Sequence, residues 1–243
     1  MICCQLTKSP TPQFTITQTL HIGKLGMVCM GILKYKGKTI SCVAKESTRY
    51  IKHEAEILAK LGKSPYREYF VQMIAPPTDL IFFPMYRGDL YNLVDEFAHD
   101  ERVSFIKQTS IALEYLHGLN YGHFDVKPEN IMIDQMCRAR LGDFGLSSRC
   151  TKYDSMILKK GTPGYRAPEV VSSNKKSYGW IADSYSFGAT IYLILVKQCF
   201  HKDWMNSSFP KDYSWRRIIN GLTNSEPTKR FDMTDFMESL IFE

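Results

Sequence analysis

The sequence lacks the features that mark membrane, secreted and low-complexity proteins. The apolar run at residues 189–196 is about ten residues too short to cross a bilayer. Seven cysteines without paired metal-ligand spacing indicate reduced thiols and not a disulfide framework. The first residues carry neither the basic nor the apolar part of a secretion signal. We therefore expect an intracellular protein, cytoplasmic or nuclear, without a membrane segment.

The distribution of charge argues against another class of protein. The chain of 243 residues has a net charge of +6, but its lysines and arginines are scattered, and no basic stripe alternates with aromatic residues. Nucleic-acid binding needs such a cluster, so we expect no nucleic-acid partner. With 44% hydrophobic and 23% charged residues, the composition is that of a globular protein long enough to bury one or two cores.

Two short segments carry the candidate chemistry: residues 123–130, HFDVKPEN, and residues 143–145, DFG. They supply what the transfer of a γ-phosphoryl group requires from a protein. Asp125 would accept the proton of the attacking hydroxyl, and Lys127 would stabilise charge on the transferring phosphate. Asn130 and Asp143 would hold Mg²⁺, a hard cation that prefers oxygen ligands. DFG alone is an ordinary turn sequence, but together the two segments predict a kinase.

Four more segments accompany these two. They are a glycine-rich loop at 21–28 (HIGKLGMV), a strand lysine at Lys45, a helix glutamate at Glu54 and the run 161–169 (GTPGYRAPE). In this order, from about Ile22 to Arg230, the motifs resemble those of the eukaryotic protein kinase superfamily. Lys127 and Thr162 resemble its serine/threonine branch. The resemblance implies an α+β, two-lobed protein kinase fold, with a small antiparallel sheet and one helix followed by a mainly helical lobe.

The resemblance also implies the layout of the domain. A single kinase domain would cover residues 1–243, with the small lobe at about 1–83, the hinge at about 84–88 and the large lobe at about 89–243. Residues 80–90 have the form of the family's fifth strand, the hinge and the start of the next helix. ATP would lie between the lobes with Mg²⁺.

Two periodicities predict that Lys45 pairs with Glu54. The strand that ends at Lys45 alternates, so that Val43 and Lys45 share one face. Residues 50–61 have helical spacing, and Glu54 lies on the apolar stripe. A carboxylate buried there needs a cation, although a lysine at the end of a strand usually reaches into solvent. Glu56 competes on the same helix but points elsewhere.

The nucleotide contacts are implied by the resemblance. His21 replaces the first family glycine and should make the loop bulkier. Phe83 would be the gatekeeper, and Pro84 keeps its carbonyl for adenine pairing beside Tyr86, although it has no N–H. Asp89 would reach the ribose or cap the next helix. The implied set is Ile22, Gly23, Gly26, Val28, Val43, Lys45, Phe83, Pro84, Tyr86 and Asp89.

The activation segment, residues 146–169, departs from the family at its anchor point. Phe124 replaces the arginine that precedes the catalytic Asp in most regulated kinases and binds a phosphate on this segment. An aromatic ring cannot make charge-assisted bonds to phosphate. Our hypothesis is that activity does not depend on phosphorylation of Thr151, Tyr153 or Ser155, and that the enzyme is constitutively assembled or switched by a partner protein.

Two pairings in the large lobe would be structural by the same resemblance. Glu169 should pair with Arg230, and Asp183 should hold the backbone of the catalytic loop.

Protein substrates with acidic or already phosphorylated sequences would be favoured if a group of four cations lies beside them. These cations are Arg149, Lys152, Lys159 and Lys160.

Other readings stay open. A pseudokinase that binds partners without transferring phosphate would suit the loss of one glycine and of the arginine before Asp125, but every charge expected to touch nucleotide or metal is present. A small-molecule kinase of the same fold does not account for residues 161–169, which resemble a platform for a peptide. The compact chain and its hinge are similar to kinases of some large DNA viruses.

Overall fold

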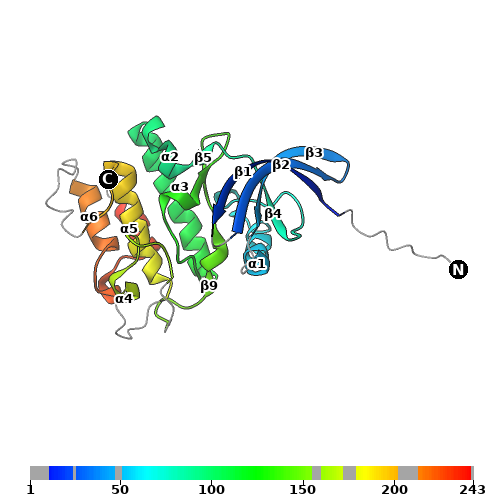
Figure 1. The fold of residues 1–243 in the computed structure, drawn as a ribbon. Helices are drawn as coiled ribbons and strands as arrows, with labels where there is room; N and C mark the ends of the chain where they lie inside the picture. Colours follow the sequence, from blue (N-terminus) through cyan, green and yellow to red (C-terminus); the bar gives the residue numbers. More distant parts are fainter. Residues whose placement is uncertain are drawn as a thin grey trace. The chain divides into compact units, whose positions relative to one another are not determined.

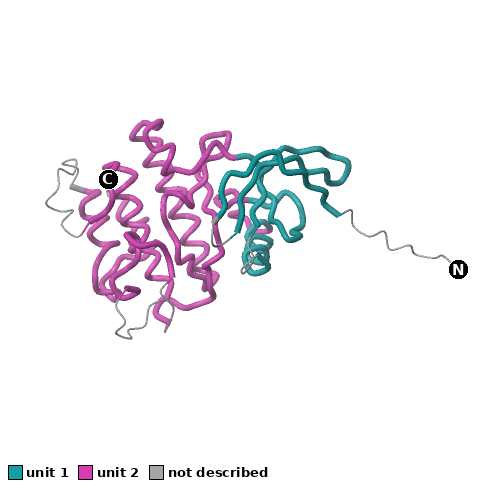
Figure 2. The backbone as a smooth tube through the Cα atoms, viewed as in Figure 1, with its two compact units in different colours: residues 1–62, 72–85 teal, residues 63–71, 86–243 magenta. Residues whose placement is uncertain are grey.

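The computed structural model describes residues 11–23, 26–46, 51–154, 160–171, 179–201 and 213–241. The backbone clusters into two compact units (Figure 2). Unit 1 comprises residues 1–62 and 72–85, and unit 2 comprises residues 63–71 and 86–243.

Unit 1 is built on an antiparallel sheet with the strand order β1-β2-β3-β4 (Figure 1). Its strands are β1 (Gln13–Gly23), β2 (Gly26–Tyr35), β3 (Lys38–Glu46) and β4 (Leu80–Pro84). Along β3, Cys42 and Ala44 are fully buried, while Val43 and Lys45 on the opposite face are partly buried. This is the alternation predicted from the sequence. It places Lys45 on a strand that has a paired neighbour on each side.

The helix of unit 1, α1 (Ile51–Leu61), buries one apolar stripe. Its buried residues are Glu54, Ala55, Ile57, Leu58 and Leu61. Glu56 is exposed, as predicted. The sheet has its own core, with Phe82 of β4 in contact with the ring of Phe14 from β1 at 5.5 Å between centroids. Burial of these side chains is the main force that holds strand and helix in place.

The sheet differs from the expectation in one strand. The run at 80–84 was expected as the family's fifth strand, but in the described part of the chain it is the fourth. Before it, the N–H of Ile74 donates to the carbonyl of Phe82 at 3.0 Å. Pro76 and Pro77 follow, and a proline has no N–H to extend a ladder. These prolines explain why the described residues directly before β4 do not form a further strand of this sheet.

Unit 2 is mainly helical (Figure 1). Its helices are α2 (Leu90–Leu93), α3 (His99–Gly118), α4 (Pro168–Val171), α5 (Ile181–Val196), α6 (Tyr213–Leu222) and α7 (Met233–Ser239). Helix α5 is buried on nearly all sides, as a central helix of a large unit must be. Phe187 of α5 meets Phe236 of α7 edge to face at 5.4 Å. No helix in the described part of the chain is long and apolar enough to span a membrane.

Short strands carry the connections of unit 2. They form the sheet β5-β7-β8, with β5 (Gly88–Asp89), β7 (Ile131–Ile133) and β8 (Ala139–Leu141), and the pair β6 (Tyr121–Gly122) with β9 (Ser148–Arg149). Residues 63–71 belong with this unit because the N–H of Val71 donates to the carbonyl of Leu141 at 3.0 Å. The ring of Phe70 also lies 6.0 Å from that of Phe144.

Candidate active site

Each unit has its own group of candidate residues, and the group of unit 1 is an ion pair. The amine of Lys45 donates to both carboxylate oxygens of Glu54, at 3.0 and 2.9 Å. The Glu54 side chain is 1% exposed and that of Lys45 is 22% exposed. A carboxylate buried this deeply needs a cation, which β3 supplies to α1. The pairing predicted from the two sequence periodicities is therefore present.

The group of unit 2 is built on the predicted catalytic loop, which is held by one buried carboxylate. Asp183 of α5 is fully buried and accepts the backbone N–H groups of His123 and Phe124, each at 2.7 Å. His117 donates to it through Nε2 at 3.0 Å. Phe124 has a φ of 64°, a conformation that bulky residues avoid. The bonds to Asp183 compensate for this strain, and they are the structural role predicted for it.

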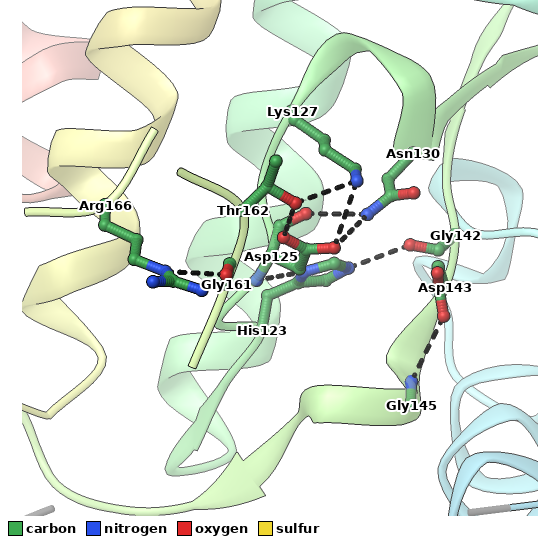
Figure 3. Close-up of polar contacts among 10 residues, drawn as sticks. All are labelled: His123, Asp125, Lys127, Asn130, Gly142, Asp143, Gly145, Gly161, Thr162 and Arg166. Carbon is green, nitrogen blue, oxygen red and sulfur yellow. Dashed lines mark hydrogen bonds and ion pairs between the residues drawn. The ribbon is translucent and has the colours of Figure 1, made fainter. Parts of the chain in front are cut away.

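The carboxylate of Asp125 is the centre of a polar cluster (Figure 3). The hydroxyl of Thr162 donates to its Oδ1 at 2.7 Å. The amine of Lys127 donates to the Thr162 hydroxyl at 2.9 Å and lies 3.4 Å from Oδ2 of Asp125. Asn130 donates through Nδ2 to the backbone carbonyl of Asp125 at 2.7 Å and to its Oδ2 at 3.1 Å. The side chain of Asp125 is thereby fixed while remaining 12% exposed.

His123 links this cluster to the segment that carries Asp143. The N–H of Asp125 donates to Nδ1 of the His123 ring at 3.2 Å, so Nε2 carries the proton and donates to the carbonyl of Gly142 at 2.9 Å. The N–H of Gly142 in turn donates to the backbone carbonyl of Asn130 at 2.9 Å. Gly142, the residue directly before Asp143, is thus bonded to the loop that contains Asp125.

The donor set of Asn130 and Asp143 fits Mg²⁺. Asn130 turns its amide nitrogen to Asp125, so its amide oxygen points away from Asp125 (Figure 3). Asp143 is exposed, and its Oδ1 accepts the N–H of Gly145 at 3.4 Å. An amide oxygen and a carboxylate are ligands that Mg²⁺ prefers. No group of three or more His, Cys, Asp or Glu side chains in the described ranges could hold a metal. Further oxygens, such as those of phosphates, would have to complete the coordination.

The described residues of the glycine-rich loop lie at the end of β1 and the start of β2. Gly23 ends β1 and is paired with Gly26, which begins β2. Ile22 is 75% exposed, and Val28 is partly buried. Residues 24 and 25 of the predicted loop lie outside the described residues.

The predicted hinge follows β4. Phe83 and Pro84 are the last residues of this strand, and Tyr86, the first hinge residue of unit 2, is partly buried. Asp89 caps helix α2, because its Oδ1 accepts the N–H of Asn92 at 2.9 Å. Of the two roles considered for Asp89, capping is the one observed in the structure, and ribose binding stays a prediction.

Two of the cations in the activation segment bind within the chain. Lys152 donates to Asp232 at 2.8 Å, and Lys160 donates to the carbonyl of Leu146 at 3.0 Å. Burial alone would lower the pKa of Lys152, but the hydrogen bond with Asp232 raises it. Arg149 is exposed. Lys159 and Ser155, which were also singled out in the sequence, lie outside the described residues.

The end of the segment is fixed by a bidentate ion pair. Arg230 donates to Oε1 and Oε2 of Glu169 at 2.6 and 2.8 Å, and the Arg230 side chain has no exposed surface. This confirms the predicted structural pair, whose two members are far apart in the sequence.

Sequence reasoning did not include Thr162 or His117 among the site residues. Thr162 was noted only as a marker of the serine/threonine branch, yet its hydroxyl binds both Asp125 and Lys127. It also contributes to a pocket of unit 2 that Asp125, Tyr165 and Lys160 line. The sequence signal that could have indicated this role is the position of Thr162 directly after Gly161, at the start of the predicted peptide platform.

Comparison with known proteins agrees with this geometry. The chain matches the protein kinase domain family over residues 14–241. It is 30% identical to the SNF1-like protein kinase ssp2 of Schizosaccharomyces pombe over 85% of this chain and 38% of that protein. It is 29% identical to human rhodopsin kinase GRK7 (84% and 39% covered), and 27% identical to CBL-interacting protein kinase 10 of Oryza sativa subsp. japonica (84% and 48%). The chain spans less than half the length of these relatives. The chain belongs to the protein kinase family.

Proposed function

We propose that the chain transfers the γ-phosphoryl group of ATP to serine and threonine hydroxyls of protein substrates. The observation that carries the proposal is the cluster around Asp125. A partly exposed carboxylate is fixed there by a hydroxyl and an amide, with the Lys127 amine 3.4 Å away. Membership of the protein kinase family and relatives that are themselves named protein kinases support the same reaction.

In the proposed reaction, Asp125 is the base. The substrate hydroxyl gives its proton to the Asp125 carboxylate as its oxygen bonds to the γ-phosphorus. The bond from that phosphorus to the bridging oxygen breaks, and ADP leaves with the electron pair. Lys127 stabilises the negative charge on the transferring group. Mg²⁺, when held by Asn130 and Asp143, would neutralise part of the phosphate charge.

Residues of unit 1 and of the hinge are proposed to bind the nucleotide. Lys45 would bind its phosphates, with Glu54 holding the amine in place. The backbone at Gly23 and Gly26 would approach the phosphates without obstruction from a Cβ. Ile22, Val28, Val43, Phe83, Pro84, Tyr86 and Asp89 complete the proposed nucleotide set.

The choice of substrate is the finer part of the proposal. The bond from Lys127 to Thr162 supports serine and threonine as acceptors, because both residues resemble that branch. A preference for acidic sequences now depends on fewer cations, since Lys152 and Lys160 donate within the chain. Arg149 is the exposed candidate in the described part of the segment. Arg149→Glu should reduce the preference for an acidic over a neutral peptide if this contact exists.

The proposal is tested with purified chain, Mg²⁺, γ-labelled ATP and a panel of Ser, Thr and Tyr peptides. Transfer to Ser and Thr by the wild type, and its loss in Asp125→Asn, is the expected result. Transfer only to Tyr would refute the branch assignment. Binding of ATP without transfer by any sample would instead favour the pseudokinase, for which the replacement of the first loop glycine by His21 is the supporting observation.

A further inference from the structure

The ring of Phe124 is packed into the fold of unit 2 and is 5% exposed. One of its neighbours is Gly122 of β6, where a Cβ would come within 2.4 Å of the ring. Gly122 is paired with Ser148 of β9, the strand at the start of the activation segment. The ring of Phe124 therefore packs against the place where this segment joins the catalytic loop.

Lys160, from the other end of the activation segment, also lies over this ring. Its amine is 4.9 Å from the ring centroid, within the range of a cation–π interaction. The same amine donates to the carbonyl of Leu146 at 3.0 Å and to the hydroxyl of Ser148. Burial lowers the pKa of the Lys160 amine, because a charged group with fewer water contacts is less stable.

The next residue, Gly161, lies close to the backbone of Phe124. Gly161 has a φ of +91°, and a Cβ there would lie 2.7 Å from the Phe124 carbonyl oxygen. Its own carbonyl accepts Nε of Arg166 at 2.6 Å. Residues 160–161 thus contact both the ring and the main chain of Phe124, and this approach requires glycine at 161.

We infer that Lys160 is a positioning residue that holds the activation segment on the catalytic loop without a phosphate. Its ammonium group joins three parts of unit 2: residues 146–148, the ring of Phe124, and the chain leading into Thr162. Phe124 immediately precedes Asp125, and Thr162 donates to Asp125. Displacement of Lys160 is therefore transmitted to the proposed base from both sides.

The chemistry explains why a lysine suits this position. A segment that is held through an arginine needs an anion as the bridge, which phosphorylation supplies. At Phe124 the acceptors are an aromatic face, a carbonyl and a hydroxyl, and each of these attracts a cation. The bridge is therefore the Lys160 ammonium group, which is encoded in the sequence and needs no modification.

The experiment compares four proteins, each treated with phosphatase and shown by mass spectrometry to carry no phosphate. They are the wild type, Lys160→Met, Lys160→Arg and the control Lys107→Met, which removes an exposed cation of α3. Amide exchange at residues 121–124 and 146–149 should be about tenfold faster in Lys160→Met, and unchanged in the control. Lys160→Arg should restore most of the protection, because it keeps the charge.

Measurements of kcat and KM distinguish a role of Lys160 in positioning Asp125 from a role in the stability of the fold alone. These measurements rest on the proposed function. In Lys160→Met, kcat should fall about tenfold while KM for ATP stays within about twofold, because the contact lies at the base and not at the nucleotide residues of unit 1. The wild-type rate should decline as the pH rises through the lowered pKa of Lys160. In Lys160→Arg this alkaline decline should move to higher pH.

Two outcomes overturn the inference: exchange and kcat both unchanged in Lys160→Met, or a wild type that gains the same protection and rate only after phosphorylation. If Lys160→Met does not fold, Phe124→Leu keeps an apolar side chain but removes the aromatic face, and should show the same changes to a smaller degree. If the wild type transfers no phosphate, the proposed function fails, while amide exchange still decides the role of Lys160.

Discussion

Unit 1 and unit 2 hold their central carboxylates in different ways. In unit 1, Glu54 is bound by the amine at the end of the long Lys45 side chain. In unit 2, Asp183 is fully buried and accepts two backbone N–H groups of the loop that carries Asp125. Ordering a lysine side chain loses more conformational entropy than a bond to main chain that is already fixed. The shape of the catalytic loop therefore belongs to the fold of unit 2, while the ion pair of unit 1 depends on one flexible side chain.

The largest effect is expected from removing the buried carboxylate of unit 2. Asp183→Ala leaves the N–H groups of His123 and Phe124 and the ring of His117 without their acceptor. Each buried unsatisfied donor costs about 1–3 kcal/mol, so the free energy of unfolding should fall by about 4 kcal/mol. Urea denaturation measures it. Asp95→Ala, at a side chain 78% exposed, is the control and should change stability by less than about 0.5 kcal/mol.

A smaller effect is expected from breaking the pair of unit 1. Lys45→Met leaves the Glu54 carboxylate buried without this cation and should lower the free energy of unfolding by about 2 kcal/mol. Adding Glu54→Gln should recover more than half of that loss, because the amide carries no charge. Phosphate transfer should stay at least about 100-fold below the wild-type rate in both variants. Equal stability of the single and double variants would mean that the two side chains are not coupled.

The smallest effect concerns the pair that ties the activation segment to α7. Burial would raise the pKa of Asp232, but the bonds from Lys152 and from backbone N–H groups hold it below its usual value. A lowered acid pKa gives stability that is present above the unfolded value, about 3.9, and is lost as the pH falls through the folded value. The raised pKa of Lys152 gives stability that persists until the pH rises through its folded value.

Comparing Asp232→Asn with the wild type tests this pH dependence. At neutral pH the variant should be less stable by about 1 kcal/mol, since Asn keeps the helix cap but not the charge. In acid, below the folded pKa of Asp232, the difference should vanish. A difference that persists unchanged into acid would show that packing, and not charge, is responsible.

Much of the site could be predicted from the sequence because its parts lie on regular elements. The alternation of β3 and the apolar stripe of α1 were sufficient to pair Lys45 with Glu54. Asp183 and the pair of Glu169 with Arg230 followed from the resemblance, since nothing local relates residues that far apart in the chain. These predictions concerned buried charges, for which few partners are possible.

The contacts that the sequence did not predict involve residues with many possible environments. A lysine usually reaches into solvent, so nothing in the sequence indicated that Lys160 would turn inward over Phe124 or that Lys152 would bind Asp232. The strand that is absent before β4 among the described residues has a local cause in Pro76 and Pro77. The prediction that residues 80–84 are the fifth strand followed the family pattern and did not take these prolines into account. Tertiary packing determines the partners of these lysines, and the local sequence does not predict that packing.

The role of Asp125 is tested by the single-turnover rate of phosphate transfer to a serine peptide, for the wild type and for Asp125→Asn, together with the affinity of each for ATP. We predict that the variant loses roughly 1,000-fold in rate and binds ATP as the wild type does. Equal rates would show that Asp125 is not the base. A parallel loss of ATP affinity would show that its role is in binding and not in the transfer step.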